Sequence, residues 1–349
     1  MTERWKETRQ FIDEALEQST RDKYDSHLRS YFEFCRKIGA RIDDPKSVAM
    51  YVFTLSRDVY AQSSINGAVS AISNHFRFAK DNPVNSPYVT QAKKSALKKA
   101  PLVRQRDELT KAHLRTWGLS VNRNSFTDVR DFTMVLFAFR GMLRGSEVAA
   151  LRAEDVFIGS IDRNIPSAEL FPIDLFGSEI LHIVITSSKT NPQSQKPVEH
   201  RKSESVLIGR DTDPLLDPIL WYARFNAKRS QAAEAFFHSF TTPPGFLSSR
   251  SFNHIVKNRL ADEGVDVSNL GGHSARAGGA TAAALANVDT RAIMKHGRWK
   301  SSAVNLYIRD STVSALNLNA AMGGFVTSQP ASAASTAASA PVPNPKPHD

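Results

Sequence analysis

Apolar side chains recur at helical spacing through the first hundred residues, and this periodicity is the strongest constraint on the fold. Five of them fall on one face of a helix expected between Ser19 and Gly39: Leu28, Tyr31, Phe32, Cys35 and Ile38. Capping residues or an N1 proline predict further helices after Asp44-Pro45, after Ser63-Ser64 and near Asn85-Ser86-Pro87. The sequence therefore predicts a compact bundle of four or five helices.

A basic run follows this predicted bundle. It contains six basic residues and no acidic one: Lys93, Lys94, Lys98, Lys99, Arg104 and Arg106. A solvated surface is the simpler explanation of such a run. Because these charges join two predicted domains of a basic chain, we favour a linker that lies along a phosphate backbone.

The second part of the chain mixes helices with a small β element. A β-branched run at 180–186 and a return strand at 205–208 predict an antiparallel pair. Helices are expected at 126–139, 215–229, 249–263, 274–286 and 290–295, and then to continue through Tyr307 to about Ala321. Residues 159–178 lack a clear hydrophobic period, which indicates an insertion between strands. The predicted fold class is mainly α, with an α+β second domain.

Composition narrows the class of protein. The chain has 45 Lys and Arg against 35 Asp and Glu, a net charge of +10, which favours an acidic partner such as nucleic acid. Cys35 is the only cysteine, so one chain can form neither a disulfide nor a thiolate cluster. No long apolar run predicts a membrane span, and residues 327–349, rich in Ala, Ser, Pro and Thr, predict a disordered tail.

Common hydrolase and nucleotide-binding signatures are missing from the sequence. The stretch from Gly272 to Arg276 approaches G-x-S-x-G, but Arg276 replaces the second glycine. There is no G-x-x-x-x-G-K-[ST] and no H-E-x-x-H, and the histidines do not cluster with carboxylates at ligand spacing. The sequence predicts neither a metal site nor a cofactor.

A set of cationic side chains on predicted turns, followed by an isolated tyrosine, remains as the candidate site. Its members are Arg144, Lys189, His273, Arg276, His296, Trp299 and Tyr307. Two arginines with a lysine and a histidine suit a phosphodiester, whose non-bridging oxygens gain charge in the transition state. A tyrosine hydroxyl can attack phosphorus covalently. Glu147, three residues after Arg144, can orient that arginine.

Simpler explanations exist for single members of this set. Arg144 could be a helix-end cation favoured by the helix dipole, Trp299 a packing residue, and Tyr307 a half-buried helical residue. Each explanation is favoured when one residue is considered alone. Their combination in one chain favours a site.

In this combination the chain resembles the tyrosine recombinase (integrase) family. Arg-x-x-Glu, a lysine in a strand-to-strand loop, His-x-x-Arg, a Trp or His and a Tyr follow one another in the family's order. The resemblance is greatest to the Cre-type branch, through HSAR at 273–276, IMKHGRW at 293–299 and NLYIR at 305–309. It covers about residues 10–322 and implies a helical DNA-clamping domain at 1–103 and a catalytic domain at 104–326. The tail at 327–349 is outside the resemblance.

Roles follow from this resemblance residue by residue. It implies that Arg144 and Arg276 grip the scissile phosphate, that Glu147 supports Arg144, and that His273 is a general acid and base. Lys189 resembles the general acid for the 5′-hydroxyl, with Lys196 and Lys202 in the same loop as alternatives. Trp299 fits the sixth position, but it lies eight residues before Tyr307 where nine are expected, so His296 is the alternative.

The resulting hypothesis is a site-specific recombinase or integrase of DNA, of the kind that mobile elements carry, that works through a 3′-phosphotyrosine at Tyr307 without metal or cofactor. The resemblance implies a tetramer on two DNA sites, with residues 311–321 docking on a neighbouring subunit. We expect an intracellular, DNA-associated protein, in a bacterial nucleoid or a eukaryotic nucleus. Two alternatives remain: a catalytically idle DNA-binding protein of this fold, and a nicking-closing enzyme similar to type IB topoisomerases.

Overall fold

The computed structural model describes residues 15–102, 105–160, 179–186, 204–240 and 244–308, together with residues 4, 7, 8, 11 and 12. The chain divides into two compact units, Met1–Gln105 and Arg106–Asp349. Among the described residues, no helix is long and apolar enough to cross a membrane. Lys189, Lys196, Lys202, Arg104 and the segments 161–178, 311–321 and 327–349 lie outside the described residues.

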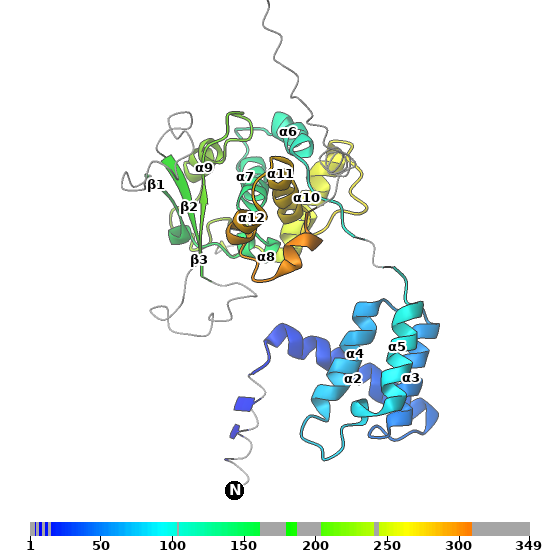
Figure 1. The fold of residues 1–349 in the computed structure, drawn as a ribbon. Coiled ribbons are helices and arrows are strands. Elements are labelled where there is room, and N and C mark those ends of the chain that lie inside the picture. The colour runs from blue at the N-terminus through cyan, green and yellow to red at the C-terminus, as the bar shows by residue number, and fades with distance from the viewer. Residues whose placement is uncertain are drawn as a thin grey trace, which may run out of the picture. The chain divides into compact units, whose positions relative to one another are not determined.

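The first unit is a helical bundle (Figure 1). Helix α3 packs on α5, and α2 packs on α4. The helices are α2 (Gln18–Ile38), α3 (Pro45–Arg57), α4 (Gln62–His75), the short 3₁₀ helix η1 (Pro83–Asn85) and α5 (Pro87–Lys99). Their shared core includes Tyr31, Val48, Val52, Ile65, Ile72 and Val89.

Local chemistry sets most boundaries in this unit. The Asp44 and Ser86 side chains accept from the backbone N–H groups of Lys46 and Tyr88, which caps α3 and α5 as predicted. Helix α2 ends at Gly39, whose φ of +64° favours glycine. Helix α4 begins at Gln62, so the serine pair expected to precede it lies in its first turn, and no described side chain caps it.

The predicted face of α2 holds only in part. Tyr31 and Cys35 are buried, whereas Ile38 is 47% exposed. Ile38 lies in the last turn, next to the glycine that ends the helix, where the chain turns away from the core.

The second unit places helices and a small sheet around one central helix. Every residue of α7 from Val129 to Phe139 is buried, which explains its continuous apolar run. The elements are α6 (Lys111–Ser120), α7 (Phe126–Arg140), α8 (Gly145–Ala149), η2 (Ala153–Asp155), β1 (Val156–Ser160), β2 (Glu179–Ile185), β3 (Glu204–Ile208), α9 (Pro218–Asn226), α10 (Ser249–Asp262), α11 (Ser274–Leu285), α12 (Thr290–Gly297) and η7 (Ser302–Leu306). In Figure 1, the sheet lies at one edge of this unit and α11 lies beside α7.

The sheet is antiparallel, with the order β1-β2-β3. Leu181 pairs with Ile208 and Ile183 with Val206, and these side chains are buried. Alternate residues of β2 face outward, as a strand with one covered face requires. The third strand, β1, is absent from the sequence prediction because its five residues give too short a pattern to recognise.

Two other predictions for this unit are wrong. Helix α9 begins at Pro218 and not at Leu215, because Asp213 caps a preceding turn and Asp217 caps the helix. Helix does not continue through Tyr307: α12 ends at Gly297, and the 3₁₀ helix η7 ends at Leu306 with Tyr307 as its C-cap residue.

Two adjacent glycines let α11 approach its neighbours closely. A Cβ at Gly278 would lie 1.8 Å from the carbonyl oxygen of Leu109, and one at Gly279 would lie 2.1 Å from that of Phe139. Neither backbone oxygen can move aside without disturbing the core. These glycines therefore fix the distance between α11 and the end of α7, where the candidate site is built.

Candidate active site

Arg144 and Glu147 lie at the start of α8. The Arg144 backbone N–H donates to Glu147 Oε2 over 2.8 Å, and its guanidinium pairs with Glu147 Oε1. Arg144 is the N-cap residue of this helix, where the helix dipole disfavours a cation. A helix-end cation favoured by the dipole is therefore the wrong explanation of Arg144, and Glu147 compensates its charge.

Glu147 is a buried carboxylate. Burial raises its pKa, but the charge of Arg298, the Arg144 N–H and the charge of Arg144 outweigh this effect and hold the pKa below its ordinary value. The carboxylate is consequently ionised at neutral pH.

Arg276 lies on the first turn of α11 and is fully buried. Its Nη1 donates to the Met142 carbonyl and its Nη2 to the Gly297 carbonyl. Burial and the nearby charge of Arg144 lower the pKa of Arg276 to about 10, so it remains protonated at pH 7. These bonds use two of the five N–H donors of a guanidinium, and Nε has no hydrogen-bond partner among the residues that the structure describes.

Trp299 covers the guanidinium of Arg276. The Arg276 Cζ lies 4.1 Å from the centroid of the Trp299 ring, and the rings of Trp299 and Tyr307 are 5.1 Å apart. The indole also packs on Gly297, where a Cβ would lie 1.8 Å from the ring. Trp299 is a packing residue, as the simpler explanation predicts. The side chains on which it packs, Arg276 and Tyr307, are members of the candidate site.

The hydroxyl of Tyr307 lies next to His273. The Tyr307 Oη is 3.5 Å from His273 Nδ1, and the Tyr307 ring centroid is 5.5 Å from Arg276 Cζ. His273 is the N-cap residue of α11, and the Tyr307 carbonyl accepts from Thr281 on the same helix. Helix α11 thus brings a hydroxyl, an imidazole and a guanidinium together.

His296 is directed elsewhere. Its Nε2 lies 2.8 Å from the carbonyl oxygen of Arg140, and burial lowers its pKa. With Lys111, Arg140 and Ala282 it lines a cavity of about 280 Å³. Of the two alternatives for the sixth position, Trp299 contacts the candidate site and His296 does not.

Arg298 was missed in the sequence. It is 8% exposed, and its Nη2 donates to Glu147 Oε2 over 2.6 Å. The sequence signal was weak, because Arg298 is one of several basic residues in KHGRWK. Only the fold shows that it faces the buried carboxylate.

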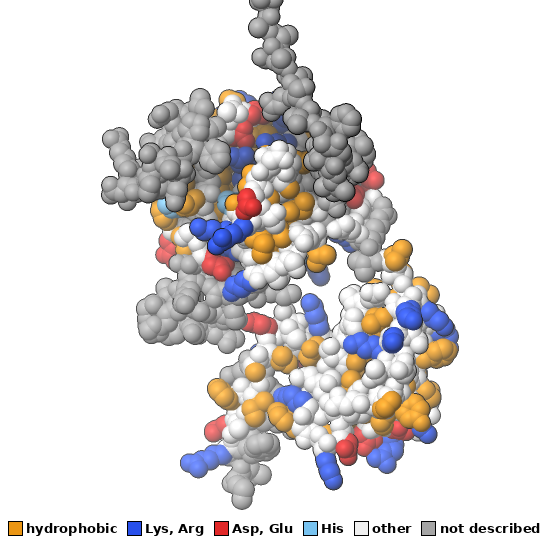
Figure 2. Space-filling view, in the orientation of Figure 1, with side chains coloured by type: hydrophobic (Ala, Val, Ile, Leu, Met, Phe, Trp, Pro, Cys, Tyr) orange, Lys and Arg blue, Asp and Glu red, His pale blue; other side chains and the backbone are white. Residues whose placement is uncertain are grey.

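The predicted basic run divides between the two units. Lys94, Lys98 and Lys99 are exposed on α5, and Lys93 is half-buried. Figure 2 shows Lys and Arg side chains gathered over α5 in the first unit. Arg106 belongs to the second unit, where its side chain passes within 3.4 Å of a Cβ position at Gly271.

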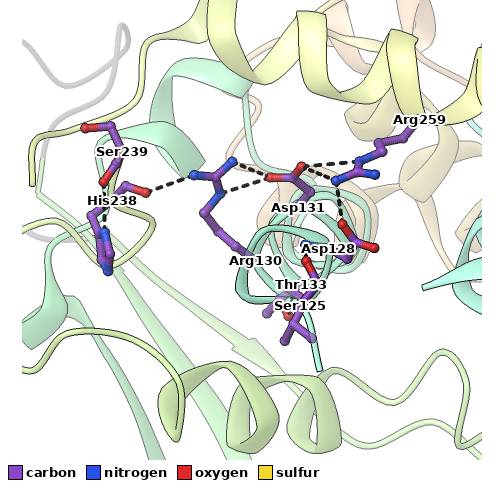
Figure 3. Close-up of polar contacts among 9 residues, drawn as sticks. Ser125, Asp128, Arg130, Asp131, Thr133, His238, Ser239 and Arg259 are labelled. Carbon is purple, nitrogen blue, oxygen red and sulfur yellow. Dashed lines mark hydrogen bonds and ion pairs between the residues drawn. The ribbon is translucent and has the colours of Figure 1, made fainter. Parts of the chain in front are cut away.

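A buried ion-pair network fixes α10 against α7 (Figure 3). Arg130 donates twice to Asp131 Oδ1 and once to the His238 carbonyl, and Arg259 of α10 bonds Asp128 and the other oxygen of Asp131. Burial raises the pKa of Asp131 in spite of both arginines. Because α10 also packs on α8, the network supports the helix that begins beside Arg144.

Comparisons with known proteins identify the fold. The sequence matches no protein-family model and no curated protein. Among solved structures, it is similar to the Tn1549 transposon integrase bound to circular intermediate DNA, with 12% identity, 87% of this chain and 94% of that chain covered, and a TM-score of 0.55.

Two further structures agree. The XerH site-specific recombinase bound to a palindromic difH substrate has 12% identity, coverage of 86% of this chain and 78% of its own, and a TM-score of 0.57. A lambda integrase dimer bound to a core site has 15% identity, coverage of 88% and 76%, and a TM-score of 0.56. The mainly helical chain with its small antiparallel sheet therefore has the tyrosine recombinase fold. These likenesses do not single out the Cre-type branch.

Proposed function

We propose that this chain is a site-specific DNA recombinase or integrase that cuts and rejoins DNA through a 3′-phosphotyrosyl bond at Tyr307. One observation carries the proposal: the Tyr307 hydroxyl lies 3.5 Å from His273 Nδ1, and the Tyr307 ring lies beside Arg276 and Trp299. The fold shared with DNA-bound recombinases supports it.

In the cleavage step, Tyr307 Oη attacks the scissile phosphorus. The Oη–P bond forms as the P–O5′ bond breaks, the Tyr307 proton passes to His273, and Lys189 donates a proton to the leaving 5′-oxygen. The phosphate stays esterified, so a strand bearing a 5′-hydroxyl is released.

The arginines stabilise the charge that develops on the non-bridging oxygens. Arg276 is held by two backbone carbonyls and by the Trp299 ring, so it is already oriented before DNA arrives. Arg144 is oriented by Glu147, and the Trp299 indole N–H is a further donor to a phosphate oxygen.

Ligation reverses these steps. A 5′-hydroxyl attacks the phosphotyrosine and gives its proton back to Lys189. The new P–O5′ bond forms as the P–Oη bond breaks, and Tyr307 recovers its proton from His273. Because the phosphoester is conserved in the covalent intermediate, the exchange needs no nucleotide hydrolysis.

The wider assignment is part of the same proposal. Double-stranded DNA is the partner, and Lys93, Lys94, Lys98, Lys99, Arg104 and Arg106 bind its phosphates. The first unit is the DNA-clamping domain and the second the catalytic domain of a Cre-type enzyme from a mobile element. Four copies assemble on two sites.

Trapping on a nicked suicide duplex tests the proposal. The wild type is expected to form an SDS-resistant adduct at Tyr307, and Tyr307→Phe is expected to bind the duplex equally and form none, because only the nucleophilic oxygen is removed. An adduct that persists in Tyr307→Phe would contradict the assignment. If the wild type forms no adduct, the chain is an idle DNA-binding protein. If it forms the adduct but does not exchange strands between two marked sites, it is a nicking-closing enzyme.

A further inference from the structure

Arg298 occupies a backbone position that favours glycine. It follows α12 with φ +60° and ψ 37°, and it is one of four non-glycine residues with positive φ among those the structure describes. Its N–H donates to the Lys295 carbonyl, and the next N–H donates to the Met294 carbonyl. This turn does not require an arginine, so the reason for one lies in the side-chain contacts.

The side chain of Arg298 joins two elements. Its Nη2 lies 2.6 Å from Glu147 Oε2 in α8, and its Nε lies 3.6 Å from Glu204 Oε2 at the start of β3. The side chain is only 5% exposed, and its Nη2 and Nε are directed at these two carboxylates.

The two oxygens of Glu147 serve different partners. Oε1 pairs with the Arg144 guanidinium, while Oε2 accepts from the Arg144 backbone N–H and from Arg298. Arg298 therefore fixes the carboxylate from one side and leaves the other oxygen for Arg144.

Charge balance gives Arg298 a second effect. Arg144, Arg276 and Arg298 face Glu147, and Glu204 faces Arg298 from β3. Three guanidinium groups and two carboxylates leave one unbalanced positive charge. A bound phosphodiester, which carries one negative charge, would neutralise this excess.

We propose that Arg298 is a positioning residue, which holds the Glu147 carboxylate in place so that Glu147 directs Arg144 toward the scissile phosphate. Through Glu204 it also ties these charged side chains to the strand that follows the loop with Lys189. This inference rests on the proposed function, because it concerns the same reaction.

Loss of Arg298 leaves Glu147 buried with one cation fewer. Burial then acts against less compensation, so the pKa of Glu147 rises from its lowered value. Glu147 Oε2 also loses the Arg298 bond that fixes it, so the carboxylate can turn and Arg144 loses its orientation.

The first experiment measures single-turnover adduct formation on a nicked suicide duplex at saturating DNA. Arg298→Met is expected to slow it by ~100-fold at pH 7, the cost of a small misplacement of a catalytic group, with an unchanged Kd. Arg298→Lys, which keeps the charge, is expected to recover much of the rate. Arg291→Met, an exposed arginine on α12, is the matched control.

A double-mutant cycle separates positioning from general destabilisation. In a Glu147→Gln background no carboxylate needs balancing, so adding Arg298→Met should slow the reaction by less than about threefold. Arg298→Gly suits the left-handed backbone, folds without strain and should behave as Arg298→Met. Effects of Glu147→Gln and Arg298→Met that multiply fully would overturn the proposal.

A second measurement needs neither DNA nor activity. In Arg298→Met the pKa of folded Glu147 is higher than in the wild type, so the folded variant keeps its proton to a higher pH. The Tm of this variant should therefore fall further below wild type as the pH rises from the acid range toward 7, and Glu147→Gln should abolish that trend. A difference independent of pH refutes the role of Arg298, whereas a missing wild-type adduct refutes only the proposed function.

Discussion

The guanidinium of Arg276 lies over the Trp299 ring, with its Cζ 4.1 Å from the ring centroid, and both side chains contact Gly297. The carbonyl of that glycine accepts from Arg276, and its missing Cβ makes room for the indole. An arginine that is fully buried and stacked has little conformational freedom left to lose. The turn at Gly297 thus fixes two side chains of the candidate site.

Substitution of Trp299 should separate packing from hydrogen bonding. Trp299→Phe keeps a ring over Arg276 but removes the indole N–H, so we expect ~10-fold slower adduct formation with modest loss of stability. Trp299→Ala removes both and should cost about 3–5 kcal/mol of unfolding free energy. Thermal unfolding and single-turnover trapping measure the two effects. Wild-type cleavage by Trp299→Phe would show that the indole N–H contacts no phosphate.

His296 should affect stability and not catalysis. Burial lowers its pKa below 6.5, so below pH 6.5 the unfolded state binds a proton that the folded state does not. Stability should thus decrease as the pH falls below 6.5. His296→Gln should flatten this decrease in a Tm series from pH 5 to 8 and change the adduct rate by less than about twofold. A much larger loss of cleavage would restore His296 as the sixth member of the site.

Lys189 can be tested apart from binding. A general acid at the 5′-oxygen supplies ~10²–10⁴ in rate, so Lys189→Ala should be slow on ordinary DNA. A 5′-bridging phosphorothiolate leaves as a thiolate and needs no proton, so this variant should approach the wild-type rate there. Arg144→Ala and Arg276→Ala should stay slow on both substrates. Rescue of Lys196→Ala or Lys202→Ala instead would assign the role to that lysine, and rescue of none would exclude a lysine acid in this loop.

The lysines of α5 should bind DNA without reading its sequence. Changing Lys93, Lys94, Lys98 and Lys99 to Gln should weaken binding to specific and random duplexes by similar factors. The slope of log K against log[salt] should flatten by about 0.9 for each phosphate that the protein no longer neutralises. Four exposed lysines of the same unit, Lys23, Lys37, Lys46 and Lys80, provide a control with an equal change of net charge. Equal slopes for the two quadruple variants would show that the α5 lysines form an ordinary solvated surface and do not bind phosphates.

Local sequence was enough to predict the elements that depend on neighbours along the chain. Asp44 and Ser86 cap α3 and α5 through bonds that span two residues, and Phe126–Arg140 and Ser249–Asp262 follow apolar patterns that a few turns suffice to show. The mainly helical fold with a small antiparallel sheet followed from these local signals. The residue types of the candidate site could likewise be read from the sequence.

Which of those residues meet depends on long-range packing. Spacing could not choose between His296 and Trp299, because the left-handed Arg298 between them ends the helical register and turns Trp299 toward Arg276 while His296 faces Arg140. The partnership of Arg298 with Glu147 spans 151 residues, and no local pattern records a contact at that separation. The pKa values of Glu147 and Arg276 depend on burial and on the charges of neighbouring side chains. Both follow from how α8, α11 and the turn after α12 pack together, and only the folded chain determines that packing.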